Sequence, residues 1–276
     1  MFIRTLAISA LAISTLACTV GQSNDELLSR DQFIDKYIAE HIDDDGQSLL
    51  TYDYDLPLQS WEEVDELYQA YVDANTASDW SVQAVVDIDG GLNLYSADQA
   101  QNLSYCISNQ FGPRKTAVIQ ALRTAANDWE GAANLDFRYL PEHDGNCTND
   151  NDAVVFNVVP ISQDSGLLAS AFFPSWPREY KQLRINLRTA FDSVVPLEGV
   201  LRHELGHALG LRHETARVEA RLRYGKHCFE NHMLAPITAY DSQSVMVTPA
   251  CVGDAFENRE FVLSDTDRQA IAWLYQ

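Results

Sequence analysis

The sequence predicts an α+β fold in which helices pack on the face of a mixed β-sheet. Two observations predict it. From about residue 100 onward, stretches with strand-like spacing alternate with stretches of helical spacing, as in sheets whose strands are joined by helices. Later in the chain, one stretch of helical spacing carries regularly placed histidines, which makes that helix a candidate metal site.

The first residues resemble an export signal. Residues 1–17 carry one charge, Arg4, followed by an uncharged run that is too short to span a bilayer. Residues 14–18 also fit a bacterial lipoprotein cleavage site, in which Cys18 becomes lipidated and attaches the chain to a membrane. Lipidation and ordinary signal cleavage remain alternatives. Both predict an extracytoplasmic protein, either secreted or held as an outer-membrane lipoprotein.

Charge divides the rest of the chain into an acidic N-terminal segment, residues 18–95, and a main domain, residues 96–276. Residues 19–113 hold 2 basic and 19 acidic side chains, a net of −17, whereas from residue 114 onward there are 16 basic and 21 acidic side chains, a net of −5. This difference predicts a boundary near residue 100. The net charge of −21 argues against nucleic acid as a partner.

The acidic segment is expected to be helical. Helical spacing covers Asn24–His41, and Ser60 with Glu63 forms a capping box that opens a second helix. The segment is either a propeptide that covers the functional site or a solvated spacer. As a propeptide it would offer a metal ligand, and Asp87 and Asp89 are its best-placed carboxylates.

The main domain is predicted from alternating patterns. Its expected strands and helices are Leu103–Ile107, Thr116–Glu130 (helix), Leu135–Leu140, Ala153–Val159, Arg184–Leu187, Val200–Leu209 (helix, opened by Pro196) and Ser264–Tyr275 (helix).

Five cysteines leave an odd one, and removing Cys18 leaves four. Four cysteines allow three connectivities. We favour the pairs that are close in sequence, Cys106 with Cys147 and Cys228 with Cys251. Two disulfides agree with export to an oxidising compartment.

The stretch from His203 to Glu214 reads His-Glu-Leu-Gly-His-Ala-Leu-Gly-Leu-Arg-His-Glu. On a helix, His203 and His207 are four residues apart and lie on one face, so both imidazoles reach one metal ion. Glu204 lies beside the first of them, where a carboxylate can hold the attacking water.

Gly210 tolerates a positive φ and so ends the helix abruptly, which returns the chain and brings His213 to the same point. Three nitrogen donors with one open position are what a catalytic zinc ion requires. We expect one such ion. The sequence offers no pattern from which a structural calcium site can be read.

The motif resembles that of the metzincin zinc endopeptidases, in particular their bacterial matrixin-like and astacin-like branch. Met246, in Ser244-Val245-Met246, is the candidate for the methionine turn of that clan. The resemblance implies a five-stranded sheet with an antiparallel edge strand, an active-site helix, the methionine turn and a C-terminal helix. One departure is clear, because Val247 and Thr248 stand where many relatives have His and Tyr.

The run from Leu167 to Pro174 resembles the edge strand on which matrixins hold an extended substrate. Its exposed backbone would pair with the substrate main chain, and small residues keep the edge open. We therefore expect Leu168, Ala169, Ser170 and Ala171 to bind substrate.

The resemblance implies a monomeric zinc endopeptidase that acts on proteins or peptides, with Glu204 as the general base. Two other functions stay open. One is an inactive binding protein of the cell envelope, suggested by Val247 and Thr248, and the other is a zinc amidase that acts on cell-wall peptides. Glu214 and Asp241 are candidates to orient the metal ligands.

Overall fold

The computed structural model describes residues 27–42, 48–52, 56–76, 92–161, 167–193, 195–217, 219–220, 237–248 and 261–276. Five predicted residues, Cys18, Asp87, Asp89, Cys228 and Cys251, lie outside these ranges, as does the signal segment. Within them, no helix has both the length and the apolar character needed to cross a bilayer.

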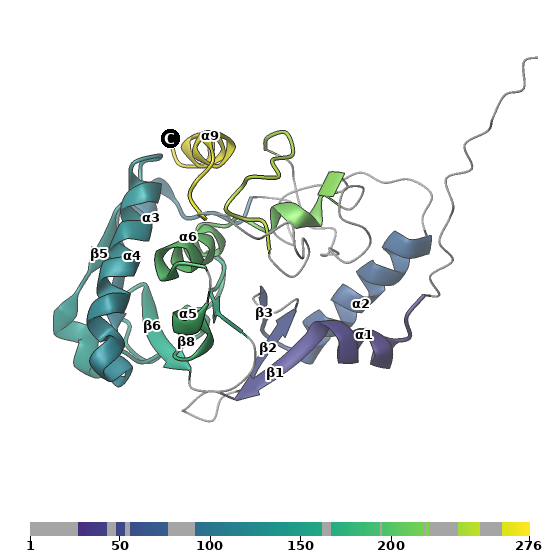
Figure 1. The fold of residues 1–276 in the computed structure, drawn as a ribbon, viewed down its shortest axis with the longest axis horizontal. Coiled ribbons are helices and arrows are strands. Elements are labelled where there is room, and N and C mark those ends of the chain that lie inside the picture. Colours follow the sequence, from purple (N-terminus) through teal and green to yellow (C-terminus); the bar gives the residue numbers. More distant parts are fainter. Residues whose placement is uncertain are drawn as a thin grey trace, which may run out of the picture.

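The main domain is built on a five-stranded mixed sheet of order β5-β4-β6-β8-β7, which confirms the expected strand number (Figure 1). Its inner pairings are parallel, whereas the edge strand β7 runs antiparallel to β8, as predicted. The strands are β4 Leu103–Ile107, β5 Phe137–Tyr139, β6 Phe156–Ile161, β7 Ala169–Ser170 and β8 Gln182–Asn186.

Helices cover this sheet and continue to the end of the chain. The α-helices of the main domain are α3 Ala97–Ala100, α4 Lys115–Glu130, α5 Thr189–Asp192, α6 Leu197–Ala208 and α9 Asp265–Leu274. Short 3-10 turns η1 Asn109–Arg114, η2 Pro141–Asn146, η3 Arg178–Tyr180 and η4 Glu214–Ala216 link them. Each predicted main-domain element is present, with ends that differ by a few residues.

Helix α4 holds helix α6 in place through one buried tryptophan and one ion pair. The indole N–H of Trp129 donates to the carbonyl oxygen of Arg202 at 3.0 Å, and the Arg202 guanidinium lies 2.5 Å from the Asp128 carboxylate. Trp129 and Leu205 are fully buried in the main core. Because α4 contacts both the backbone and the side chain of Arg202, these contacts fix the orientation of α6 against α4.

The N-terminal unit, residues 27–76, corrects the expectation of a purely helical segment. It comprises α1 Arg30–Tyr37, a three-stranded antiparallel sheet of β1 Ile38–Ile42, β2 Ser48–Tyr52 and β3 Leu56–Leu58, and α2 Trp61–Thr76. The predicted helix over Asn24–His41 is wrong at its end, since Ile38–Ile42 pair with β2. Pairing with a distant strand overrides helical spacing that is local.

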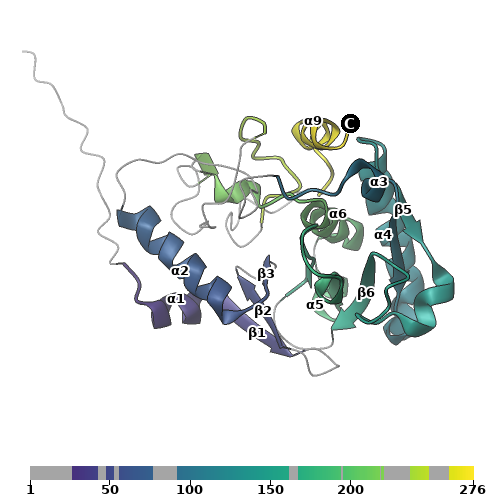
Figure 2. The ribbon, with the colours of Figure 1, turned by 180° about the vertical axis from the view of Figure 1, so that it is seen from behind.

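The second N-terminal helix begins as predicted. The Glu63 backbone N–H donates to the Ser60 hydroxyl oxygen at 3.3 Å, but the Glu63 carboxylate accepts from the N–H of Gln59 rather than of Ser60. Figures 1 and 2 show this unit beside the main domain, on the side away from α4.

The predicted bridge between Cys106 and Cys147 is present. It joins β4 to the turn η2 and lies in a small buried cluster with Val154. The bridge fixes one end of the sheet, distant in sequence from the histidine motif.

Helix α6 ends at Ala208 and is capped by Leu209, and the next residue, Gly210, has a φ of 94°. A Cβ atom at this position would lie 2.3 Å from the Asn93 carbonyl oxygen. The predicted helix stop is therefore confirmed, and it is enforced both by the backbone angle and by the close approach of residue 93.

Gly210→Ala is expected to lower the free energy of unfolding by about 2 kcal/mol or more, because the side chain is strained at positive φ and collides with a backbone carbonyl. Thermal or denaturant unfolding measures the loss. Gly145→Ala is the matched control, since a Cβ there meets nothing within 4 Å. Equal stability of the two variants would contradict the account of the turn.

Candidate metal centre

The three histidines of the motif meet at one point. On α6, His203 and His207 lie one turn apart on the same buried face, and the turn at Gly210 brings His213 to them. The Nε2 atom of His203 is 3.2 Å from that of His207 and 3.1 Å from that of His213. All three side chains are buried.

Hydrogen bonds at Nδ1 of His203 and His207 indicate whether the Nε2 atoms of these rings can bind a metal ion. The Nδ1 atom of His203 lies 2.7 Å from the Val245 carbonyl oxygen, and that of His207 lies 2.8 Å from the Leu211 carbonyl oxygen. A carbonyl oxygen only accepts, so each Nδ1 carries the proton and each Nε2 presents a lone pair. Lone pairs at 3.2 Å repel one another unless a cation lies between them.

The donor set fits zinc. Ligands at about 2.0–2.1 Å from a tetrahedral ion are separated by about 3.3 Å, close to the spacings of 3.1 and 3.2 Å. Three neutral imidazoles are the donors of catalytic zinc sites, and outer hydrogen bonds orient two of them here, His203 and His207.

Met246, the candidate for the methionine turn, packs against the ligand helix α6. It is buried, and its sulfur lies where a side chain at residue 206 would stand, since a Cβ on Gly206 would be 2.3 Å away. The Met246 carbonyl oxygen accepts from the N–H of Glu214 at 2.8 Å, next to the third histidine. The turn thus contacts both the ligand helix and the ligand loop.

Asp267 holds the turn that precedes Met246, a role that was not predicted from the sequence. Its carboxylate accepts from the Ser244 hydroxyl at 2.6 Å and from the Val245 N–H at 2.8 Å, and it also accepts from the N–H of Ser264. Burial raises the pKa of Asp267 above its usual value, and these hydrogen bonds only partly offset that effect. The only local signal was its place in the cap of the C-terminal helix.

Glu204 follows His203 on α6 and is 2% exposed. A carboxylate so deep in the site is consistent with the predicted role in proton transfer rather than with a solvated helix surface.

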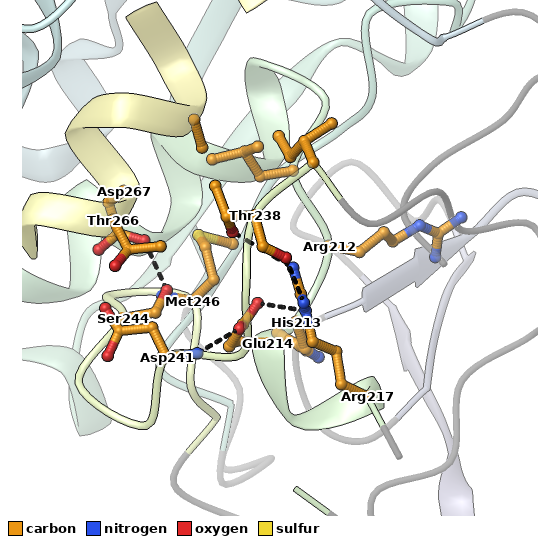
Figure 3. Close-up of a pocket in the computed structure, with 13 residues that line it drawn as sticks. Arg212, His213, Glu214, Arg217, Thr238, Asp241, Ser244, Met246, Thr266 and Asp267 are labelled. Carbon is orange, nitrogen blue, oxygen red and sulfur yellow. Dashed lines mark hydrogen bonds and ion pairs between the residues drawn. The ribbon is translucent and has the colours of Figure 1, made fainter. Parts of the chain in front are cut away.

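The other two acidic candidates, Glu214 and Asp241, stabilise the loop that carries His213. The Glu214 carboxylate accepts from the Asp241 N–H at 2.7 Å and pairs with Arg217 at 2.9 Å (Figure 3). Burial raises the pKa of Glu214 to about 7, against the opposing effect of Arg217. Both line a small cavity with Met246, and Arg212 and His213 line it as well.

The predicted substrate-binding run lies at the sheet edge. Ala169 and Ser170 form β7, and Ala171 is buried with them, whereas Leu168 is half-buried. Three residues beyond β7, the Phe173 ring lies 5.8 Å from the His207 ring. The run therefore leads from the edge strand to the metal ligands.

Phe173 and Arg212 were not identified from the sequence as site residues. The Arg212 guanidinium lies over the Phe173 ring at 4.2 Å, and Arg212 immediately precedes His213. Phe173 lies in the run Leu167–Pro174 and Arg212 in the histidine motif, and only the folded chain brings these two stretches together.

A family model described as "Dual-action HEIGH metallo-peptidase" matches residues 60–275, and this chain has Leu205 where the family's name has Ile. Two solved structures of myroilysin, each 18% identical, are similar with TM-scores of 0.45 and 0.44; they cover 66% and 74% of this chain, and each match covers 95% of myroilysin. The family match confirms the metallopeptidase predicted from the motif. The chain belongs to the Peptidase M57 family of HEIGH metallo-peptidases.

Proposed function

We propose that this metallopeptidase is an exported zinc endopeptidase that hydrolyses internal bonds of extended polypeptides. The observation that carries the proposal is the convergence of three Nε2 lone pairs beside a buried carboxylate.

His203, His207 and His213 hold the ion. When bound, zinc supplies the Lewis acidity that activates water and polarises the scissile carbonyl group. Glu204 takes the proton of the attacking water and returns it to the leaving amine. Val245 and Leu211 keep two of the imidazoles in the tautomer that binds metal.

The edge strand β7 orients the substrate. Its outer backbone pairs with an extended peptide whatever the sequence of that peptide, so the scissile bond is presented to the metal in one direction. Small side chains at Ala169, Ser170 and Ala171 leave room for that approach. Endopeptidase activity follows from a binding edge that does not require a free chain end.

Export is supported by the disulfide between Cys106 and Cys147, because such bridges persist in oxidising compartments. Signal cleavage, lipidation at Cys18 and the monomeric state remain predictions, as does the domain boundary at residue 95. The family match begins at residue 60 and so includes α2.

The N-terminal unit packs against Phe173, a residue that contacts His207, and this packing supports the propeptide over the spacer. Phe173, next to His207, belongs to a buried cluster whose other members come from that unit: Phe33, Tyr37, Tyr52, Leu67 and Tyr71. A solvated spacer is not expected to bury its aromatic side chains against Phe173 beside the metal ligands.

Glu204→Gln is expected to lower kcat/KM by about 10²- to 10⁴-fold while zinc remains bound, because the amide cannot accept a proton. Peptide turnover and zinc content measure the two effects. Glu198→Gln, on the first turn of the same helix, is the matched control. Normal turnover in the Glu204 variant would remove that residue from the mechanism.

Incubation with casein and with peptidoglycan, each with and without a chelator, separates the candidate functions. We expect casein cleavage that the chelator abolishes and added zinc restores. Cleavage of peptidoglycan alone would indicate a cell-wall amidase, and zinc binding without either activity would indicate an inactive binding protein.

Release of the N-terminal unit is expected to raise activity by about tenfold or more, the effect of removing a cover held by about 1.4 kcal/mol. A specific protease site inserted between residues 77 and 91 of the full chain allows the folded protein to be cut. Peptide turnover is measured before and after cutting, with the same insertion left uncut as control. Unchanged turnover after separation of the fragments would favour the spacer.

A further inference from the structure

The loop that follows the edge strand, residues 173–176, leads to the metal ligands. The Phe173 ring lies 5.8 Å from the His207 ring, and the Trp176 ring lies 6.0 Å from that of Phe173. The Trp176 N–H donates to the Phe173 carbonyl oxygen at 3.0 Å, which closes the loop into a turn. We call residues 173–176 the wall loop, because a peptide that extends along β7 towards the metal ligands would meet it.

Asn93 holds the wall loop through two hydrogen bonds to one residue. Its Nδ2 atom donates to the Ser175 hydroxyl oxygen at 2.6 Å, and its Oδ1 atom accepts from the Ser175 backbone N–H at 2.8 Å. Asn93 is 8% exposed, whereas Ser175 is exposed. A buried side chain 82 residues away in sequence thus fixes both the backbone and the side chain of the loop.

The backbone around Asn93 lies against the turn that returns the third metal ligand. Its carbonyl oxygen approaches Gly210 so closely that no Cβ atom fits at that residue. Two residues later, the Tyr95 N–H donates to the Tyr275 hydroxyl oxygen, and this hydroxyl donates to the carbonyl oxygen of Leu209 beside the end of α6. This segment therefore crosses the end of the ligand helix, and Asn93 joins that end to the wall loop.

The N-terminal unit holds the same loop by different contacts. Phe173 is a member of the aromatic cluster of that unit, and Trp176 packs against the cluster. Release of the unit removes these contacts and leaves the two hydrogen bonds of Asn93, which belong to the part of the chain that follows the cut. The position of the wall loop then depends more strongly on Asn93.

We infer that Asn93 is a positioning residue for substrate binding, which keeps the wall loop in register with the ligand turn after the N-terminal unit has been released. The inference rests on the proposed peptidase function. It also places the start of the active unit before residue 93, ahead of the boundary at residue 95. A wall that is fixed before the substrate arrives lowers the cost of binding, because less of the chain must be ordered in the complex.

Asn93→Ala tests this role in the full chain that carries the inserted protease site and has been cut. We expect KM for a peptide substrate to rise by about tenfold and kcat to change by less than about twofold, because the wall loop is displaced while zinc and Glu204 stay in place. Asn93→Asp should restore KM, since a carboxylate accepts from both the N–H and the hydroxyl of Ser175. Asn134→Ala, at an exposed asparagine whose side chain accepts from Gln101, is the matched control.

Hydrogen exchange at the Ser175 amide gives a readout that does not depend on turnover. This N–H donates to Asn93, so its exchange rate reports the contact directly. We expect exchange to quicken by about tenfold in Asn93→Ala after cutting, and by less before cutting, when the N-terminal unit still holds the loop. Ser175→Ala removes only the bond to the hydroxyl and should give a smaller rise in KM. Because its position is exposed, this variant replaces Asn93→Ala if that chain does not fold.

The outcomes separate the positioning role from the peptidase. A lower melting temperature with unchanged KM would mean that Asn93 serves stability alone, which overturns the inference. Unchanged exchange at Ser175, or faster exchange with unchanged KM, overturns it as well, and the peptidase stands in each case. Faster exchange together with weaker binding of a fluorescent peptide, in a chain that cleaves nothing, supports the positioning role and overturns the peptidase.

Discussion

Three imidazole lone pairs that face one another inside a protein repel unless a cation joins them, and the surrounding structure is arranged to hold them in this position. Carbonyl oxygens of Val245 and Leu211 fix the tautomers of two rings. Val245 is itself held by Asp267, which caps the C-terminal helix. The metal site is therefore stabilised by hydrogen bonds that begin in α9 and end at His203. Trp129 and Arg202 fix α6 from the other side.

Much of this site could be predicted because its signals are local. Helical spacing places His203 and His207 on one face, and Gly210 permits the turn that returns His213. The antiparallel edge strand and the bridge between Cys106 and Cys147 were also predicted correctly. The histidine motif has a spacing that permits few geometries, whereas the edge strand was expected from the family resemblance and the bridge from the order of the cysteines along the chain.

Features that depend on distant pairing could not be predicted. The strand β1 carries helical spacing and becomes a strand only because β2 lies beside it. Asp267 resembles an ordinary cap residue until the fold brings Ser244 and Val245 within hydrogen-bond distance. Phe173 follows the edge strand and Arg212 lies in the histidine motif, but their stacking depends on how the edge strand and the ligand loop meet. Composition showed that the N-terminal segment was acidic, but its packing against Phe173 depends on an aromatic cluster that only the folded chain brings together.

The C-terminal helix has a consequence for the order in which the site is completed. Tyr275 donates its hydroxyl to the carbonyl oxygen of Leu209, at the end of the histidine helix, and accepts from the N–H of Tyr95. Of these residues, Tyr275 is made after all three histidines, so a nascent chain carries every ligand before it carries the tyrosine that holds Leu209 and Tyr95. The contact that closes the C-terminal end of the histidine helix therefore forms only after translation has passed residue 275.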